Sequence, residues 1–238
     1  MQVKILTLLP DMFPGPLAYS VIGRALQKGI WSLEVINIRD FALDRYHTVD
    51  GPSVGGGPGM ILRPDVLADS IKYAKNGCDD YSIMYMSPRG NVLNQTKSRE
   101  ISYKKKIIII CGRFEGIDQR IIDHFHIEEV SIGDYVLTGG EIAAYALLDG
   151  CVRLLPGVLT NDSVFVEESF GHDSVYTSLL EYPQYTKPLI WNDVHVPEIL
   201  VSGHHKNITE WKLQQAEVYT KKHRPDLWQI YKKSNKLG

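Results

Sequence analysis

The stretch KIIIICGRFEGID at residues 106–118 decides the fold of this chain. Its first half contains a continuous apolar run, 107–111, which is typical of a strand buried on both faces of a parallel sheet. Two glycines, Gly112 and Gly116, follow the run directly. Because ligands bind outside the carboxyl ends of the strands in open parallel sheets, this stretch predicts an α/β protein with a glycine-bearing loop at a ligand site.

The rest of the first two-thirds of the chain alternates between strand-like and helix-like segments. The pattern predicts strands over 3–9, 33–38, 82–86 and 106–111, and helices over 17–28 and 65–75. A glycine stands just beyond each helical segment, at Gly29 and Gly77, where helices commonly end. Such alternation predicts βα units and a parallel sheet with helices on both faces.

The character of the sequence changes after residue 156. Residues 160–175 are polar, rich in Ser and Asp, and without clear periodicity, whereas 209–223 and 225–233 have the pattern of helices. We therefore expect an α/β domain over 1–159, a flexible linker over 160–175 and a small helical domain over 176–238.

Composition and charge narrow the class of protein. The 238 residues are 44% apolar and 23% charged, as in ordinary globular domains. The net charge is −2, but residues 203–238 carry eight Lys or Arg against three acids. This asymmetry favours a surface that faces nucleic acid, although a solvated basic helix would have the same charge. The three cysteines include no C-x-x-C pair and the longest apolar run is short, so we expect a cytoplasmic protein without a membrane partner.

Three successive strands are each followed by a loop that contains glycine. These loops are 87–90, 112–116 and 132–141. Glycine lets backbone N–H and C=O groups approach a ligand closely, so the three loops together predict a pocket for a small molecule. The turn after the first strand has no G-x-G-x-x-G, and Gly-Lys-Ser/Thr occurs nowhere, which argues against dinucleotide and P-loop folds. The glycine run 55–59 is either a flap over a ligand or a plain flexible loop.

Several motifs in this order resemble one family closely. They are GGGPGM at 55–60, MSPRG at 86–90, ICGRFEGID at 110–118, SIGDYVLTGGE at 131–141, RLLPGVL at 153–159, EESF at 167–170 and YPQYTKP at 182–188. Together they resemble the bacterial tRNA (guanine-N1)-methyltransferases, the TrmD family of the SPOUT superfamily, over almost the whole chain.

The resemblance implies more than the residue patterns alone do. The α/β domain would end in a deep trefoil knot, an exception to the rule that protein chains are unknotted. The knot would bind S-adenosylmethionine, and the protein would be a homodimer with its active sites at the interface. The substrate would be tRNA, methylated at N1 of the guanine that lies 3′ of the anticodon, tRNA position 37.

The resemblance also implies which residues bind the cofactor. They are Tyr85, Met86, Ser87, Pro88, Gly112, Glu115, Ile132, Gly133, Tyr135, Leu137, Gly139 and Gly140. For Glu115, a salt bridge that holds its loop is an equally good interpretation. The other side chains could be ordinary core residues.

On the substrate side, methyl transfer to guanine N1 needs a base and a group that stabilises negative charge at O6. By resemblance Glu168 is the base and Arg153 the O6 partner, although a solvated carboxylate and a structural ion pair are the simpler roles for these two. Further contacts to tRNA are expected from Gly57, Gly59, Ser202, His204, His205 and Lys206.

The histidines do not predict a metal site. His124 and His126, like His204 and His205, lack further ligands at zinc spacing. The resemblance implies a dependence on magnesium, but no cluster of carboxylates in the sequence defines its ligands. Two other functions remain open: a knotted RNA-binding protein without turnover, and a knotted methyltransferase that acts on ribosomal RNA.

Overall fold

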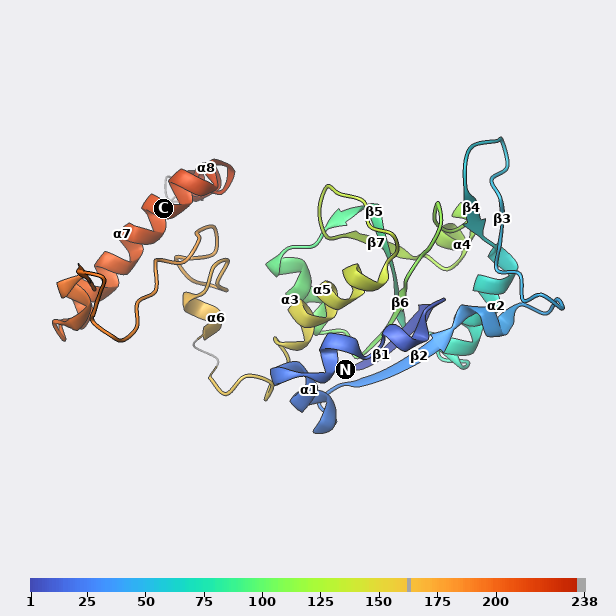
Figure 1. Cartoon of the computed structure of the whole chain (residues 1–238), viewed down its shortest axis with the longest axis horizontal. Coiled ribbons are helices and arrows are strands. Elements are labelled where there is room, and N and C mark those ends of the chain that lie inside the picture. The colour runs from blue at the N-terminus through green and yellow to red at the C-terminus, as the bar shows by residue number, and fades with distance from the viewer. Residues whose placement is uncertain (162–163, 235–238) are drawn as a thin grey trace. The chain divides into compact units, whose positions relative to one another are not determined.

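The computed structural model describes residues 1–161 and 164–234 (Figure 1). By its internal contacts the chain divides into two compact units, Met1–Thr160 and Asn161–Gly238. Residues 162 and 163 of the predicted linker and Lys236 of the basic segment lie outside the described residues.

A five-stranded parallel sheet forms the centre of the first unit. Its strands lie in the order β2, β1, β6, β5, β7, and their bounds are Ser32–Asn37, Gln2–Thr7, Lys106–Ile110, Ser82–Val92 and Glu128–Ser131. Every neighbouring pair is parallel. The predicted α/β fold with a parallel sheet is therefore confirmed.

The isoleucine run of β6 explains why the sheet is covered on both faces. Ile107 and Ile109 pack into one hydrophobic cluster, and Ile108 and Ile110 into the other, because successive side chains of a strand point to opposite faces. The first cluster is completed by helices α1 (Ser20–Gln27), α3 (Gln95–Ser102) and α5 (Glu141–Val152). The second is completed by α2 (Pro64–Lys75) and α4 (Gln119–His124). Strand β6 therefore contributes side chains to the hydrophobic core on both faces of the sheet.

Local signals set where these helices begin and end. Pro64 is the first residue of α2, and Asn76, with φ of 47°, ends it in the left-handed conformation. The side chains of Asn94 and Asp118 accept backbone N–H bonds at the starts of α3 and α4. Short 3₁₀ turns occupy Pro10–Met12, Gly15–Ala18 and Ile38–Phe41.

The structure corrects two sequence-based predictions in this unit. The helix expected from residue 17 begins at Ser20, because the proline-rich segment before it forms a 3₁₀ turn. None of the predicted strands adjoins the glycine run 55–59, but the run is the tip of an antiparallel hairpin of β3 (Asp50–Pro52) and β4 (Met60–Leu62). Gly51 and Pro52 hid β3, since both residue types are rare in strands.

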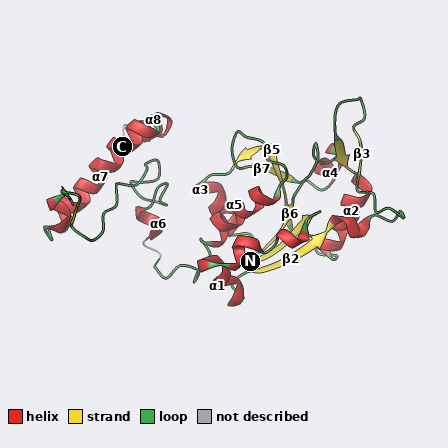
Figure 2. Ribbon diagram, viewed as in Figure 1, coloured by secondary structure: helices red, strands yellow, loops and turns green. Residues whose placement is uncertain are grey.

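The second unit is small and mainly helical (Figure 2). Its long helices are α7 (His205–His223) and α8 (Pro225–Ser234), accompanied by α6 (Val164–Glu167), a 3₁₀ turn (Glu198–Val201) and a hairpin of β8 (Ile190–Trp191) and β9 (Val194–His195). Its core contains Tyr176, Leu179, Tyr182 and Ala216, against which Trp211 and Trp228 pack. The Thr220 hydroxyl accepts the backbone N–H of Leu180, so the segment before the hairpin is fixed to α7.

The described part of the predicted linker 160–175 contains a short helix and specific side-chain contacts. It contains α6, whose Glu167 forms a 2.9 Å ion pair with Lys212 of α7 and accepts a hydrogen bond from the Tyr182 hydroxyl. The backbone N–H of Phe170 also bonds to the carbonyl of Leu179. The described part of this segment therefore packs on the second unit. Its contacts are specific side-chain pairs, which leave no periodic pattern in the sequence.

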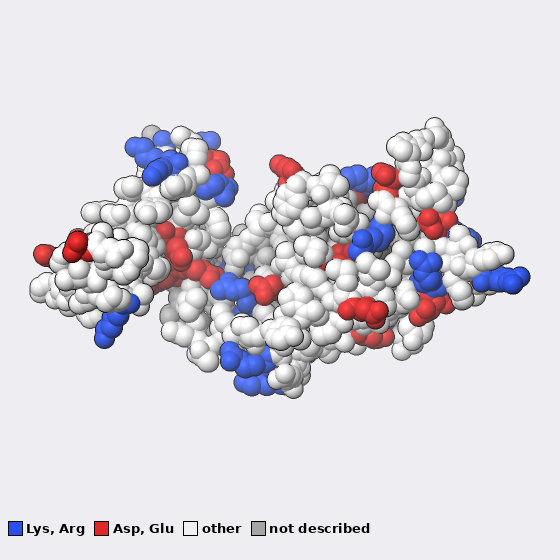
Figure 3. Space-filling view, viewed as in Figure 1, with Lys and Arg blue, Asp and Glu red and all other residues white. Residues whose placement is uncertain are grey.

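Basic side chains gather over the end of the second unit where α7 meets α8 (Figure 3). The last turn of α7 carries Lys221 and Lys222, and that of α8 carries Lys232 and Lys233. Arg224, between the helices, is paired with Asp226 at 2.6 Å. None of the helices in the described part of the chain combines the length and hydropathy that a bilayer span needs.

Candidate functional site

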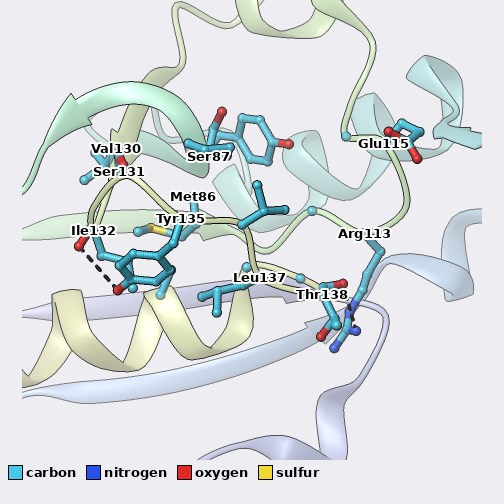
Figure 4. Close-up of a pocket in the computed structure, with 18 of the residues that line it drawn as sticks. Met86, Ser87, Arg113, Glu115, Val130, Ser131, Ile132, Tyr135, Leu137 and Thr138 are labelled. Atoms are coloured by element: carbon cyan, nitrogen blue, oxygen red, sulfur yellow. Dashed lines mark hydrogen bonds between the residues drawn. The ribbon is translucent and has the colours of Figure 1, made fainter.

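The three glycine-bearing loops meet at the carboxyl edge of the sheet and enclose a cavity of about 220 Å³ (Figure 4). The first loop is an irregularity within β5, which pairs with β7 up to Met86 and again from Asn91. The second follows β6, and the third connects β7 to α5. The cavity therefore lies where an open parallel sheet is expected to bind its ligand.

All twelve residues that were predicted to bind the cofactor line this cavity. The other lining residues were not predicted to bind it: Arg113, Phe114, Gly116, Val130, Ser131, Val136, Thr138 and Ala143. Most of these residues lie within the three glycine-bearing loops, so their position in a loop was the signal that could have identified them. Ala143 carried no signal of its own, because it looks like any residue of a buried helix.

Close packing, against backbone in one case and an aromatic ring in the other, explains two of the cavity's glycines. A Cβ atom at Gly140 would lie 2.8 Å from the Cα of Cys111 and 3.1 Å from the backbone nitrogen of Gly112. The backbone N–H of Gly140 donates to the carbonyl of Gly112 at 3.0 Å. A Cβ at Gly112 would in turn lie 2.6 Å from the Tyr85 ring. The second and third loops are thus held against each other by backbone contact.

A buried carboxylate lies beside the cavity. Glu141, whose side chain is 1% exposed, forms a 2.9 Å ion pair with Arg113 and accepts a 2.7 Å hydrogen bond from the Thr7 hydroxyl. Arg113 also donates to the backbone carbonyl of Thr138 at 3.2 Å. Burial, together with the nearby Glu141, raises the pKa of the Cys111 thiol well above its ordinary value. Cys111 is therefore not a nucleophile at neutral pH.

The remaining polar groups of the cavity are held by short-range bonds. The Ser131 hydroxyl bonds to both the backbone N–H and the carbonyl of Gly133, and the Tyr135 hydroxyl donates to the carbonyl of Ile132 (Figure 4). Burial, and to a lesser extent Glu129, raises the pKa of the Tyr85 hydroxyl. The Tyr85 hydroxyl therefore stays protonated at neutral pH, and the side chain lines the cavity without a charge.

Glu115 connects the cavity to the glycine hairpin. Its backbone N–H donates to the carbonyl of Met60 in β4 at 2.9 Å. A Cβ at Gly59, where φ is +88°, would lie 2.5 Å from the Cγ of Glu115. Of the two glycines that were predicted to contact tRNA, Gly59 is thus adjacent to a cavity residue, and Gly57 lies at the tip of the same hairpin.

Arg153 does not line this cavity. It caps the C-terminal end of α5, while Ala143 of the same helix lines the cavity near its start. At a rise of 1.5 Å per residue, the ten-residue step from Ala143 to Arg153 corresponds to about 15 Å. The structure therefore does not bring Arg153 of the same chain to the predicted cofactor residues.

Glu168 lies in the second unit, directly after α6, and lines a separate cavity of about 270 Å³ with five neighbours, Val164, Glu167, Glu181, Tyr182 and Gln184. The other residues predicted to bind tRNA are in the same unit. The Ser202 hydroxyl accepts the backbone N–H of His204 just before α7, and His205 and Lys206 are exposed in its first turn. The roles of these residues stay predictions.

Metal ligands are not clustered in the described residues. Within 1–161 and 164–234, no three side chains of His, Cys, Asp or Glu come together in a way that could hold a metal ion. His124 packs edge-on against Phe125.

The fold and the cavity define a class of protein: an α/β protein with a cavity that three glycine-bearing loops line at the carboxyl edge of a parallel sheet. Comparison with known proteins identifies the family within this class. The sequence profile of tRNA (Guanine-1)-methyltransferase TrmD matches residues 1–230.

Curated relatives agree with this match over nearly their full lengths. Proteins named tRNA (guanine-N(1)-)-methyltransferase are 50% identical in Ehrlichia canis and 52% identical in the Wolbachia endosymbiont of Brugia malayi, each alignment covering 95% of both chains. One from Bartonella henselae is 50% identical over 98% of this chain and 97% of its own. The chain belongs to the tRNA (guanine-N1)-methyltransferase family, TrmD.

Proposed function

We propose that this protein transfers the methyl group of S-adenosylmethionine to N1 of the guanine 3′ of the anticodon in tRNA, at position 37. Family membership supports the reaction class. The observation that carries the proposal for this chain is the cavity at the sheet edge, which three glycine-bearing loops line.

The cavity suits a cofactor that is recognised mainly by backbone groups. At Gly112, Gly139 and Gly140 an added Cβ would collide with neighbouring atoms, so the loops can pack this closely only as glycine. When bound, S-adenosylmethionine supplies a methyl group already activated by its sulfonium. The task of the protein is therefore to position the two reactants and to stabilise charge.

The acceptor side needs a proton acceptor, because guanine N1 carries a proton and gains its lone pair only when that proton leaves. Glu168 is our proposed base, and Arg153 is proposed to stabilise the negative charge that then develops on O6. The tRNA contacts are proposed at Gly57 and Gly59 of the hairpin and at Ser202, His204, His205 and Lys206 of the second unit.

We also propose that the active form is a homodimer with its sites at the interface. The position of Arg153, about 15 Å along α5 from the cavity of its own chain, supports a role for it at the cavity of a partner chain. The deep trefoil knot is proposed for the same region, where the loops after β6 and β7 pack together.

Two further expectations belong to this proposal. Magnesium is expected to assist the reaction, at a site whose ligands the sequence does not define. The expected compartment is the cytoplasm, where the free thiols of Cys78, Cys111 and Cys151 would remain reduced.

Two assays separate this function from its alternatives. Calorimetry should show that the protein binds S-adenosylmethionine, and incubation with labelled donor should methylate transcript tRNA whose target base is guanine. A transcript with adenine at that position is the matched control and should remain unlabelled. Donor binding without methyl transfer would favour a knotted RNA-binding protein without turnover. Methyl transfer to ribosomal RNA alone would favour a knotted ribosomal RNA methyltransferase.

A further inference from the structure

The ion pair of Glu141 and Arg113 connects three separate segments beside the cavity. Glu141 is the first residue of α5, and Arg113 lies in the loop after β6. Thr7 at the end of β1 donates to the Glu141 carboxylate, and the carbonyl of Thr138 in the third loop accepts from Arg113. The three segments lie at the carboxyl ends of three different strands, β1, β6 and β7.

Gly139 shows how tightly the pair is packed. A Cβ atom there would lie 2.5 Å from the Nε of Arg113 and 2.6 Å from the Oε2 of Glu141. The third loop therefore passes directly over the ion pair. In Figure 4 the Arg113 side chain lies next to Thr138 at one end of the cavity, while Glu115 stands apart from them.

Stability alone is a poor reason for this arrangement. Burying both charges costs desolvation energy that their attraction barely repays, and apolar replacements of such pairs are often equally stable. Arg113, with 21% of its side chain exposed, lines the cavity, whereas the 1% exposed Glu141 does not. Among the residues that line the cavity, only Arg113 and Glu115 carry charged side chains. The charge of Arg113 therefore acts directly on any bound ligand.

The proposed donor makes that charge important. S-adenosylmethionine carries a sulfonium cation, and S-adenosylhomocysteine, the product, has a neutral sulfur in the same place. An unbalanced guanidinium would repel the sulfonium of the donor but not the neutral sulfur of the product. The cavity would then bind S-adenosylhomocysteine in preference to S-adenosylmethionine.

We propose that Glu141 is a positioning and charge-balancing residue: it holds Arg113 against the third loop and cancels its charge, so that the cavity accepts the cationic donor. This inference rests on the proposed function, because it assumes a sulfonium ligand. Glu141 itself touches no ligand and acts only through Arg113.

The test is the ratio of two dissociation constants, donor over product, measured by calorimetry at pH 8 on the full chain. In Glu141→Gln the amide can still accept the Thr7 hydrogen bond, but Arg113 is unbalanced. At an effective dielectric constant of about 20 and moderate salt, the ratio should rise by about tenfold. In the double variant Arg113→Met and Glu141→Gln, which carries neither charge, it should return to the parent value.

Arg113→Met alone covers the case in which Glu141→Gln fails to fold. Removing the guanidinium leaves the Glu141 carboxylate, which accepts from the Thr7 hydroxyl at the N-terminus of α5, without its cation, so the ratio should then fall below that of the parent. The matched control is Glu34→Gln, which breaks a 2.9 Å ion pair with Lys4 away from the cavity and should leave the ratio unchanged.

The charge-balancing role would be overturned if a folded Glu141→Gln variant bound donor and product with equally reduced affinity, or with the parent's affinities. An unchanged ratio in Arg113→Met would overturn it as well. A parent protein that binds neither ligand would instead overturn the proposed function, and this inference with it. The two failures are therefore distinguishable.

Discussion

At the scale of single residues, Gly140 shows a glycine that is required by its surroundings. Its φ of −80° and ψ of −9° are open to any amino acid. The restriction comes from the backbone of Cys111 and Gly112, which leaves no room for a Cβ. An added methyl group must therefore separate the second and third loops of the cavity.

We predict that Gly140→Ala lowers the affinity for S-adenosylmethionine by about tenfold or more, since the loops must move apart to admit the methyl group. Gly150 of the same helix is the matched control, because its Cβ would meet nothing closer than the Ser98 hydroxyl at 3.4 Å. Gly150→Ala should keep the affinity and raise stability by up to about 1 kcal/mol. Calorimetry measures the affinity and thermal unfolding the stability. Equal affinities of the Gly140→Ala variant and the parent would contradict the view that close contact between the loops requires glycine at this position.

Glu167 and Glu168 are neighbours with different expected roles. Glu167 is paired with Lys212 and Tyr182, whereas Glu168 is the proposed base. Glu168→Gln should slow single-turnover methyl transfer by about 100-fold or more, because the amide cannot accept the N1 proton. Glu167→Gln, the control of equal size one residue away, should leave the rate within a factor of a few. Similar rates for both variants would exclude Glu168 as the base.

The pairing of Glu167 also predicts a pH effect on stability. Hydrogen bonds from Lys212 and Tyr182 lower the pKa of Glu167 in the folded protein. The stabilisation is therefore complete above the ordinary glutamate pKa of about 4.3 and is lost as the pH falls through the lowered folded value. Because 56% of the carboxylate side chain is exposed, the effect should stay below about 1 kcal/mol. Glu167→Gln should lower the melting temperature slightly at pH 7 and leave it unchanged near pH 2, and an equal loss at both pH values would contradict this pairing.

At the scale of elements, the sequence predicted what local patterns encode. The isoleucine run of β6, the helical patterns of α2 and α8 and the glycine beyond α2 predicted these elements to within a few residues. The glycine-bearing loops predicted the cavity because each loop follows a strand, and the edge of a parallel sheet then brings the loops together.

Contacts between distant residues could not be predicted in this way. Glu141 and Arg113 are 28 residues apart, and each looks like an exposed charge in the sequence. β3 was missed because its pairing with β4 compensates for residues that disfavour strands. The position of Arg153 at the far end of α5 depends on which end of that helix meets the cavity, which no pattern within the helix specifies.

For α7, we predict that Lys221 and Lys222 contact the tRNA backbone. Replacing both by alanine should weaken tRNA binding. It should also reduce the slope of log binding constant against log salt concentration by up to about two, because each phosphate contact contributes roughly one unit of this slope. Arg224 is omitted because Asp226 pairs with it. Lys72 and Lys75 of α2, each paired with an aspartate, provide a matched double variant. Identical salt slopes for the α7 variant and the parent would mean that this face is only solvated.

At the scale of the whole molecule, the shared site predicts that two inactive proteins can complement each other. One chain carries Glu168→Gln. The other carries Leu137→Trp, in which the new ring fills the cavity from a residue that is 38% exposed and can change without disturbing the core. After random exchange of equal amounts, about half of the dimers are mixed, and one of the two sites in each combines an intact cavity with an intact Glu168. The mixture should therefore recover up to about one quarter of the parent's active sites. Confirmed mixed dimers with no recovered methylation would contradict the shared site.

The most direct test of the whole account is to map the methylated nucleotide. Transcript tRNA treated with this protein and S-adenosylmethionine should gain a single methyl group, located by mass spectrometry of nuclease fragments at the guanine 3′ of the anticodon and identified as N1-methylguanosine. The Glu168→Gln variant should leave the same fragment unmodified over the same time. A methyl group on another nucleotide, or on another atom of that guanine, would contradict the account.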